Sequence, residues 1–123
     1  MAYSNYKYAS NMYGPIALTS EELDYAIFDK YGVYLLADNS SVGYKIKYVG
    51  RGHLKTRLRQ RIGKYNYFYY EHANHEFTRF RRECEEFHRY GKANQLDNKV
   101  HPAKPPGYDT PLCTQRGCNG ESV

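Results

Sequence analysis

The chain has 123 residues, a formal net charge of +5 and a pI of about 9.0. This length is typical of one domain with a modest core, and the composition gives no sign of a second domain. No stretch is apolar enough to cross a membrane and the N-terminus lacks a secretion signal, so we expect a soluble, cytoplasmic protein without a membrane partner. The basic balance favours a polyanionic partner such as nucleic acid, although many basic proteins bind none.

An extended N-terminal arm is predicted for residues 1–18, which are rich in Tyr, Ser and Asn and follow no helical or strand period. Its tyrosines suit base stacking, but packing or disorder is the favoured interpretation. A helix is predicted to begin at Thr19, which pairs with Glu22 in a capping box, and to end before Gly32.

An antiparallel hairpin is predicted next. Residues 32–37 are apolar throughout, which indicates a central strand, and turn-forming residues follow them. Residues 44–49 alternate, which places Tyr44, Ile46 and Tyr48 on one face and Lys45, Lys47 and Val49 on the other. Two glycines, Gly50 and Gly52, are predicted to end this strand.

A cationic helix is predicted over residues 53–63, with Leu54, Leu58 and Ile62 as its buried stripe. An aromatic strand over 65–70 and a helix over about 75–90, capped by Asn74, complete the regular elements. In that last helix Glu83 lies at the border of the apolar stripe, whereas Glu85 and Glu86 are predicted to be solvated.

These elements predict an α+β fold with a small three-stranded antiparallel sheet flanked by helices. We expect the domain to span residues 19–107, ending in a proline-rich wrap, with a flexible C-terminal tail over 108–123.

The three cysteines give little sign of a metal site. Cys84 is predicted to be a small buried hydrophobe of the last helix. Cys113 and Cys118 are loosely spaced, with His101 the only plausible further ligand, and structural zinc normally has four. Two thiols in a flexible tail are therefore expected.

Five features in chain order carry a resemblance to a known family. They are Gly-Val-Tyr at 32–34, Tyr-Val-Gly at 48–50, Leu-Lys-Thr-Arg-Leu at 54–58, Arg-Glu-Cys-Glu-Glu-Phe-His at 82–88, and Leu-Asp-Asn at 96–98 before the prolines. This pattern resembles the GIY-YIG nuclease family, and it covers the chain from Gly32 to about Pro106. The two tripeptides alone would be a weak signal, but the five features in order are specific.

The resemblance implies a catalytic centre that includes Tyr34, Tyr48, Arg57, Glu83 and Asn98. Arg51 is added as the sixth predicted catalytic residue, because it would supply positive charge beside the tyrosines. One of the two tyrosines would orient or deprotonate the attacking water, with Tyr34 favoured, and nearby cations would lower the high pKa of a phenol. Arg57 would hold the scissile phosphate with its planar fork. Glu83 would bind one Mg²⁺ or Mn²⁺, with Glu76 and Glu86 as competitors for this role. Asn98 would either support that glutamate or the waters of the metal, or only cap or turn the chain.

Basic and aromatic residues near these motifs are candidate nucleic-acid contacts: Lys45, Lys47, His53, Lys55, Arg59, Arg61 and Tyr65. The chain departs from the family at Arg61, where relatives often carry His or Tyr. Arginine cannot act as a base, so either Arg61 binds phosphate at this position, or His53 or Tyr65 takes the missing role.

The leading interpretation is a DNA endonuclease that acts as a monomer or homodimer. Two alternatives stay open: a non-catalytic nucleic-acid-binding module on the same fold, and a toxin or RNA-directed nuclease.

Overall fold

The computed structural model describes residues 12–26, 29–41, 43–103, 105 and 113. Most of the predicted arm and tail, including Cys118, therefore lies outside the described residues. The elements in chain order are β1 (Tyr13–Ala17), α1 (Ser20–Ala26), β2 (Tyr31–Ser40), β3 (Gly43–His53), α2 (Leu54–Arg59), β4 (Tyr67–His72), α3 (Glu76–Arg89) and α4 (Lys92–Gln95).

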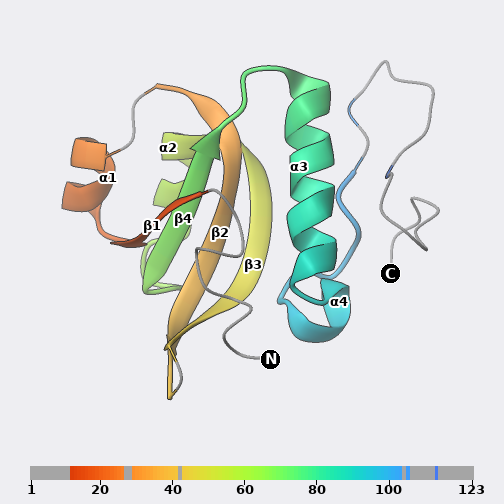
Figure 1. Ribbon diagram of the computed structural model, residues 1–123. Coiled ribbons are helices and arrows are strands. Elements are labelled where there is room, and N and C mark those ends of the chain that lie inside the picture. The colour runs from red at the N-terminus through yellow and green to blue at the C-terminus, as the bar shows by residue number, and fades with distance from the viewer. Residues whose placement is uncertain (1–11, 27–28, 42, 104, 106–112, 114–123) are drawn as a thin grey trace.

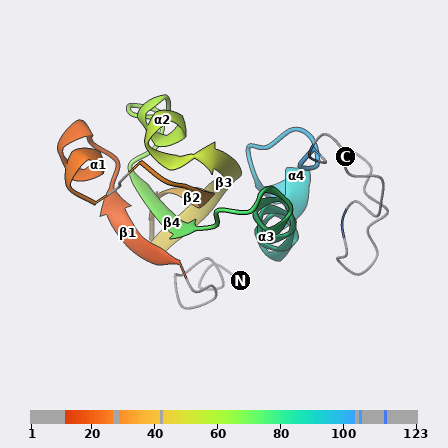
Figure 2. The ribbon, with the colours of Figure 1, turned by 90° about the horizontal axis from the view of Figure 1, so that it is seen from above.

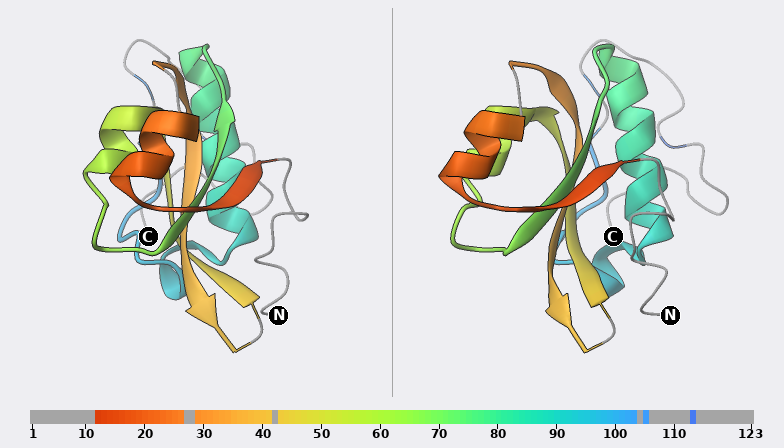
Figure 3. Two further views of the ribbon diagram at one scale, coloured as in Figure 1. Left: turned by 90° about the vertical axis from the view of Figure 1, so that its left-hand side faces the viewer. Right: turned by 60° about the vertical axis from the view of Figure 1, so that its left-hand side comes forward.

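A single antiparallel sheet with the strand order β1-β4-β2-β3 forms the middle layer. Helix α3 covers one face and helices α1 and α2 cover the other, as Figures 1 and 3 show. Each face has its own apolar cluster, one with Phe87 of α3 and the other with Leu23, Leu54 and Leu58 of α1 and α2. The predicted α+β class and the central position of the first hairpin strand are confirmed.

The sheet has four strands in the described part of the chain, so the prediction of three was wrong. The additional strand is β1, which comes from the predicted arm and pairs with β4 through Tyr13↔Tyr70 and Ile16↔Phe68. Its pairing is interrupted between these two positions, where the chain reads Gly14-Pro15. Proline has no N–H to donate, and it is tolerated because β1 is an edge strand.

A β-bulge in the hairpin changes the predicted alternation of β3. Leu36 lies opposite Tyr48 but Ala37 lies opposite Ile46, so Lys47 is the extra residue. Ile46 therefore packs with Val49 in the cluster beneath α3, whereas Tyr48 packs against the cluster of the opposite face. The prediction that Ile46 and Tyr48 share a face was wrong, because a bulge reverses the side-chain direction beyond it.

The helices are shorter than the sequence predicts. Thr19 does cap α1, since its Oγ1 accepts a hydrogen bond from the Glu22 amide at 3.2 Å. Helix α2 ends at Arg59, which leaves Ile62 exposed instead of in the buried stripe. Helix α3 is capped by His75 and not by Asn74, because the His75 side chain accepts from the Phe77 amide. Within the described ranges, none of the helices has both the length and the apolarity needed to span a bilayer.

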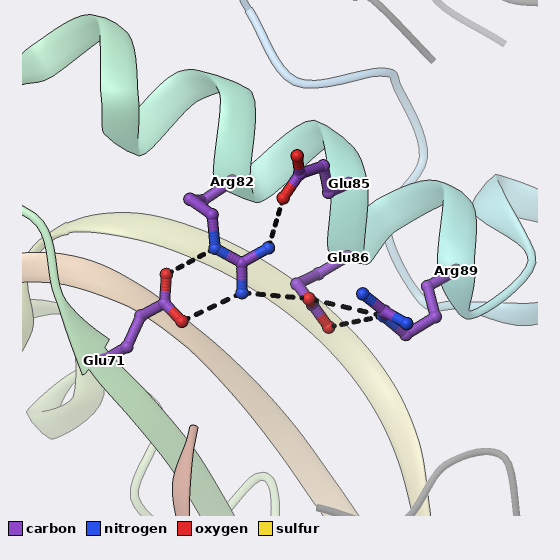
Figure 4. A network of polar contacts seen from close by, with 5 residues as sticks. All are labelled: Glu71, Arg82, Glu85, Glu86 and Arg89. Carbon is purple, nitrogen blue, oxygen red and sulfur yellow. Dashed lines mark hydrogen bonds and ion pairs between the residues drawn. The ribbon is translucent and has the colours of Figure 1, made fainter. Parts of the chain in front are cut away.

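An ion-pair network fastens α3 to the sheet (Figure 4). Arg82 reaches both carboxylate oxygens of Glu71 on β4, at 2.6 and 2.9 Å, and also bonds to Glu85 and Glu86. These carboxylates raise the pKa of Arg82, chiefly through the hydrogen bonds that Arg82 donates to Glu71. The guanidinium is therefore shared between the helix and the strand.

Glu86 is completely buried, so the prediction of a solvated charge was wrong for this residue. Its Oε2 accepts from Arg82, and Arg89 Nε lies 3.3 Å from both oxygens with hydrogen-bond geometry toward Oε2 only. Burial raises the pKa of the Glu86 carboxyl, and the two arginines oppose that shift. Helical spacing alone placed Glu86 away from the apolar stripe, but two arginines make its burial tolerable.

Substituting Arg82 by methionine should destabilise the fold, because Glu71 and Glu86 would lose their shared cation while staying largely buried. Breaking such a pair costs about 2–4 kcal/mol when the partners are partly exposed. Urea unfolding of Arg82→Met and of the control Arg81→Met measures this; Arg81 is the exposed neighbour on the same helix. Equal unfolding midpoints for the two variants would contradict the role of the network.

Candidate active site

The C-terminal end of β3 lies between α2 and α3 (Figure 2). A cleft of about 360 Å³ opens there. Four arginines and two glutamates line it, so its charge is net positive. The lining residues are Tyr31, Tyr34, Tyr48, Gly50, Arg51, Gly52, Arg57, Arg61, Glu76, Arg79 and Glu83. Five of the six predicted catalytic residues are among them, although they come from β2, β3, α2 and α3.

The motif glycines are required by close packing, and they do not end the strand as predicted. Strand β3 continues through Gly50 and Gly52 to His53, pairing with β2 throughout. A Cβ on Gly50 would overlap the Tyr34 ring, and a Cβ on Gly32 would overlap the Glu71 carbonyl oxygen. A Cβ on Gly52, whose φ is +136°, would lie 3.0 Å from Arg57 Nε. These glycines let Tyr34 and Arg57 cross the strand.

The two motif tyrosines lie side by side, with near-parallel rings whose centroids are 6.4 Å apart. Tyr34 is only 3% exposed, and burial together with Tyr48 raises its pKa to about 12 against the lowering effect of Arg61 and Arg57. The prediction that cations lower the pKa of Tyr34 was therefore wrong, because desolvation of the phenolate outweighs them. Tyr34 stays protonated at neutral pH.

Arg61 acts on Tyr48. Its Nη2 donates to the Tyr48 hydroxyl at 2.9 Å, and its guanidinium lies 4.3 Å from the centroid of the Tyr48 ring. Since the oxygen of Tyr48 accepts from Arg61, its own proton points elsewhere. Tyr48 is half-buried and keeps access to the cleft.

His53 and Tyr65, which were predicted to take the role of the missing base, do not line the cleft. His53 caps α2, accepting from the Thr56 amide at 3.4 Å, and its other ring nitrogen contacts Asp29. Tyr65 donates to Asp97 at 2.7 Å, and burial and that bond raise its pKa. Both have structural partners, and a lone sequence does not reveal such partners.

Glu83 is 7% exposed and forms an ion pair with Arg51, reaching the cleft from α3. Burial raises the pKa of the Glu83 carboxyl, although Arg51 opposes the shift. Arg51 also donates to the Ala103 carbonyl and stacks on Phe80 at 5.4 Å. The pair crosses the edge of the sheet and joins β3 to α3.

Tyr31 and Arg79 were missed by sequence reasoning, and Glu76 was considered only as a competitor of Glu83 for the metal. Arg79 is held by the carbonyls of Ala73 and Asn74 at 2.9 and 2.7 Å, and its guanidinium lies 4.8 Å from the ring centroid of Tyr31. Glu76 and Arg79 precede Glu83 by seven and four residues, which places all three on one side of a helix. This spacing could have pointed to them once Glu83 was chosen.

Asn98 is not among the residues that line the cleft. Its side chain bonds to the backbone of β3 and not to Glu83, which it was predicted to support. Its amide accepts from the Val49 N–H at 3.0 Å and donates to the Val49 carbonyl at 2.7 Å. Both groups of this buried side chain therefore serve the backbone of β3. Asn98 fixes the strand between Tyr48 and Gly50.

The remaining predicted nucleic-acid contacts do not gather in the cleft. Lys55 and Arg59 reach Asp24 of α1, at 3.9 and 2.7 Å, and line a second groove along α2 with His53. Lys45 and Lys47 lie on β3 toward the turn of the hairpin. Of the seven candidates, Arg61 alone is among the residues of the cleft.

Comparisons of this chain with protein-family models, with curated proteins and with solved structures find no match. The chemistry must therefore be argued from the cleft itself.

Tyr34 should make the protein less stable in alkali. Its folded pKa of about 12 lies above the ordinary value of 10.0, so near pH 11 the folded chain keeps a proton that the unfolded chain has lost. Stability that is complete below pH 10 is then lost as the pH rises, by about 1.4 kcal/mol at pH 11. Tyr34→Phe should reduce the difference in unfolding free energy between pH 8 and pH 11 by this amount. An unchanged difference would place Tyr34 in a more polar setting.

Proposed function

We propose that this chain is a metal-dependent endonuclease that hydrolyses phosphodiester bonds in DNA, in the manner of the GIY-YIG nucleases it resembles. One observation carries the proposal: a single positive cleft brings together both motif tyrosines, Arg57 and Glu83, which lie up to 49 positions apart in the sequence. Structural roles alone would not require these residues to meet.

Arginines in the cleft suit a phosphate substrate. Arg57 lies along Gly52 at the open side of β3, and it is exposed. A guanidinium is always charged and can hold two phosphate oxygens at once. Arg79 is fixed by backbone carbonyls and lies nearby in the lining. Arg57 would contact the scissile phosphate, and Arg79 would help to attract the strand.

Tyr48 is a better partner for the attacking water than Tyr34. Tyr34 is buried and keeps its proton, which leaves it the role of positioning the site by packing on Gly50. Tyr48 reaches the cleft with its hydroxyl oxygen already accepting from Arg61. That contact fixes the phenol, and the Arg61 cation would stabilise the negative charge left on the Tyr48 oxygen when the phenol gives its own proton to solvent, so that this oxygen can take a proton from the attacking water. Arg61 thus assists Tyr48 in place of a further base.

Glu83 fits a single hard cation. Its carboxylate is an oxygen donor in the lining of the cleft, and Mg²⁺ is commonly held by one or two carboxylates together with water and phosphate. Mn²⁺ accepts the same donors. The ion would act as a Lewis acid on the leaving oxygen. Until it binds, Arg51 neutralises Glu83 and holds it toward the cleft.

The purified protein should cut plasmid DNA with Mg²⁺ or Mn²⁺, and two arginines of α2 provide a matched pair of variants. Arg57→Ala should lower the rate at saturating DNA by about 10²–10³-fold, because it removes a donor to the transition state. Arg59→Ala should leave that rate within about threefold, since Arg59 faces Asp24 and the neighbouring groove. Equal losses would show that Arg57 acts only through general charge.

Glu83→Gln in the same assay tests the metal. It keeps the shape of the side chain, and it should abolish cutting that rising Mn²⁺ does not restore. Normal cutting by this folded variant would contradict the assignment of Glu83.

The tyrosines should differ in their pH response. Tyr48→Phe should lose about 10²–10⁴-fold in rate, as expected for a group that handles a proton. Tyr34→Phe keeps the ring on Gly50, so it should lose about tenfold or less, by a factor constant between pH 6 and 9. Rates measured across this range for both variants check the assignment. A larger, pH-dependent loss in Tyr34→Phe would return the proton transfer to Tyr34.

A non-catalytic nucleic-acid-binding module is the second candidate, because Glu83 and Tyr48 are each already engaged by an arginine. This alternative predicts DNA or RNA binding that weakens steeply with salt, without cleavage in any divalent metal. Cleavage of RNA in preference to DNA would support the toxin or RNA-directed alternative.

A further inference from the structure

A second group of metal-ligating side chains lies on α3, beyond the cleft. Ligand atoms of Cys84, His101 and Cys113 all lie within 4.8 Å of one another. The three residues are 1%, 3% and 7% exposed, and Phe77 and Phe80 pack around the two sulfur atoms. They come from one helix and from two later parts of the chain, so the fold and not the local sequence brings them together.

His88 is the residue best placed to supply a fourth donor, although it is not one of the three whose ligand atoms all lie within 4.8 Å of one another. It follows Cys84 by four residues on α3, which puts both on one side of the helix. Its Nε2 lies 3.5 Å from Cys113 Sγ, and its ring centroid is 5.5 Å from that of His101. Donor atoms on a tetrahedral zinc ion are about 3.3–3.8 Å apart, given bonds of about 2.0–2.3 Å. The distance from His88 Nε2 to Cys113 Sγ falls in this range, and the ligand atoms of Cys84, His101 and Cys113, which lie within 4.8 Å of one another, would draw closer around an ion.

The tautomer of His101 also suits metal binding. Its Nδ1 lies 2.9 Å from the Pro102 carbonyl oxygen, which can only accept, so Nδ1 carries the hydrogen and Nε2 carries the lone pair. A metal-bound histidine is commonly oriented in this way by a backbone carbonyl on its other nitrogen.

We propose that Cys84, His88, His101 and Cys113 form a structural zinc site. Two sulfurs and two imidazole nitrogens are a common ligand set for Zn²⁺, and binding would release one proton from each thiol. The soft thiolates distinguish this site from Glu83, whose oxygen donors prefer Mg²⁺ or Mn²⁺. The zinc would hold residues 101 and 113 against α3, beside the segment that carries Asn98 and Ala103.

Zinc content tests the site directly. The whole chain, purified with Zn²⁺ present and dialysed without chelator, should contain about one zinc per chain by elemental mass spectrometry. Loss of the residue that hydrogen-bonds to a metal ligand lowers metal affinity by about 10–100-fold, and removal of a ligand itself lowers the affinity further. Cys113→Ser and His88→Ala should therefore lose at least about tenfold in Zn²⁺ affinity, whereas Cys118→Ser should keep the wild-type affinity. Zinc retained by His88→Ala but lost by Cys118→Ser would overturn the ligand set.

A second measurement uses the wild-type protein, so it does not depend on whether the variants fold. Titrating wild-type protein with a chelator should release zinc together with a fall in Tm, and Co²⁺ added to the metal-stripped, reduced protein should give a thiolate charge-transfer absorption band. Protein that takes up neither Zn²⁺ nor Co²⁺ under reducing conditions would overturn the proposal. A chain two hydrogen masses lighter, with Cys84 joined to Cys113 in a disulfide, would also overturn it.

Discussion

The candidate site depends on two glycines, Gly50 and Gly52, near the end of β3. At Gly50 and Gly52 the edge strand is bare, so the Tyr34 ring lies on one glycine and Arg57 on the other. Arg51, between them, points to the opposite face and meets Glu83 on α3. Groups from both faces of the sheet thus reach one cleft around a strand edge. A larger residue at Gly50 would collide with the Tyr34 ring, and one at Gly52 would strain the backbone and displace the Arg57 side chain.

Much of the fold could be predicted from the sequence, because hydrophobic period and glycine placement are local signals. The hairpin, the cationic helix and the long third helix were all found near their true positions. The fourth strand was missed, since Gly14-Pro15 looks like a turn and only its pairing partner on β4 makes it a strand. The bulge at Lys47 was also missed, because it is defined by register between two strands and leaves no mark in either one alone.

The site could be predicted as a set of residues but not as an electrostatic environment. Tyr34, Arg57 and Glu83 were identified from a pattern, and they line one cleft. The protonation of Tyr34 was misjudged because burial is a property of the packed molecule. Burial raises the pKa of Tyr34 by more than the nearby cations lower it. For a similar reason the sequence predicted Cys84 in the core and Cys113 in a flexible tail, because their proximity depends on the path of the intervening chain.

The amide of Asn98 has a consequence for how two copies could associate. The outer edge of β3 would otherwise offer N–H and carbonyl groups to a strand from another molecule. Asn98 already engages both groups of Val49, and the Asp97 amide donates to the Lys47 carbonyl at 2.6 Å. The segment after α4 thus acts as a short substitute strand that blocks extension of the sheet along this part of β3. A second copy of the chain would therefore have to associate through another surface.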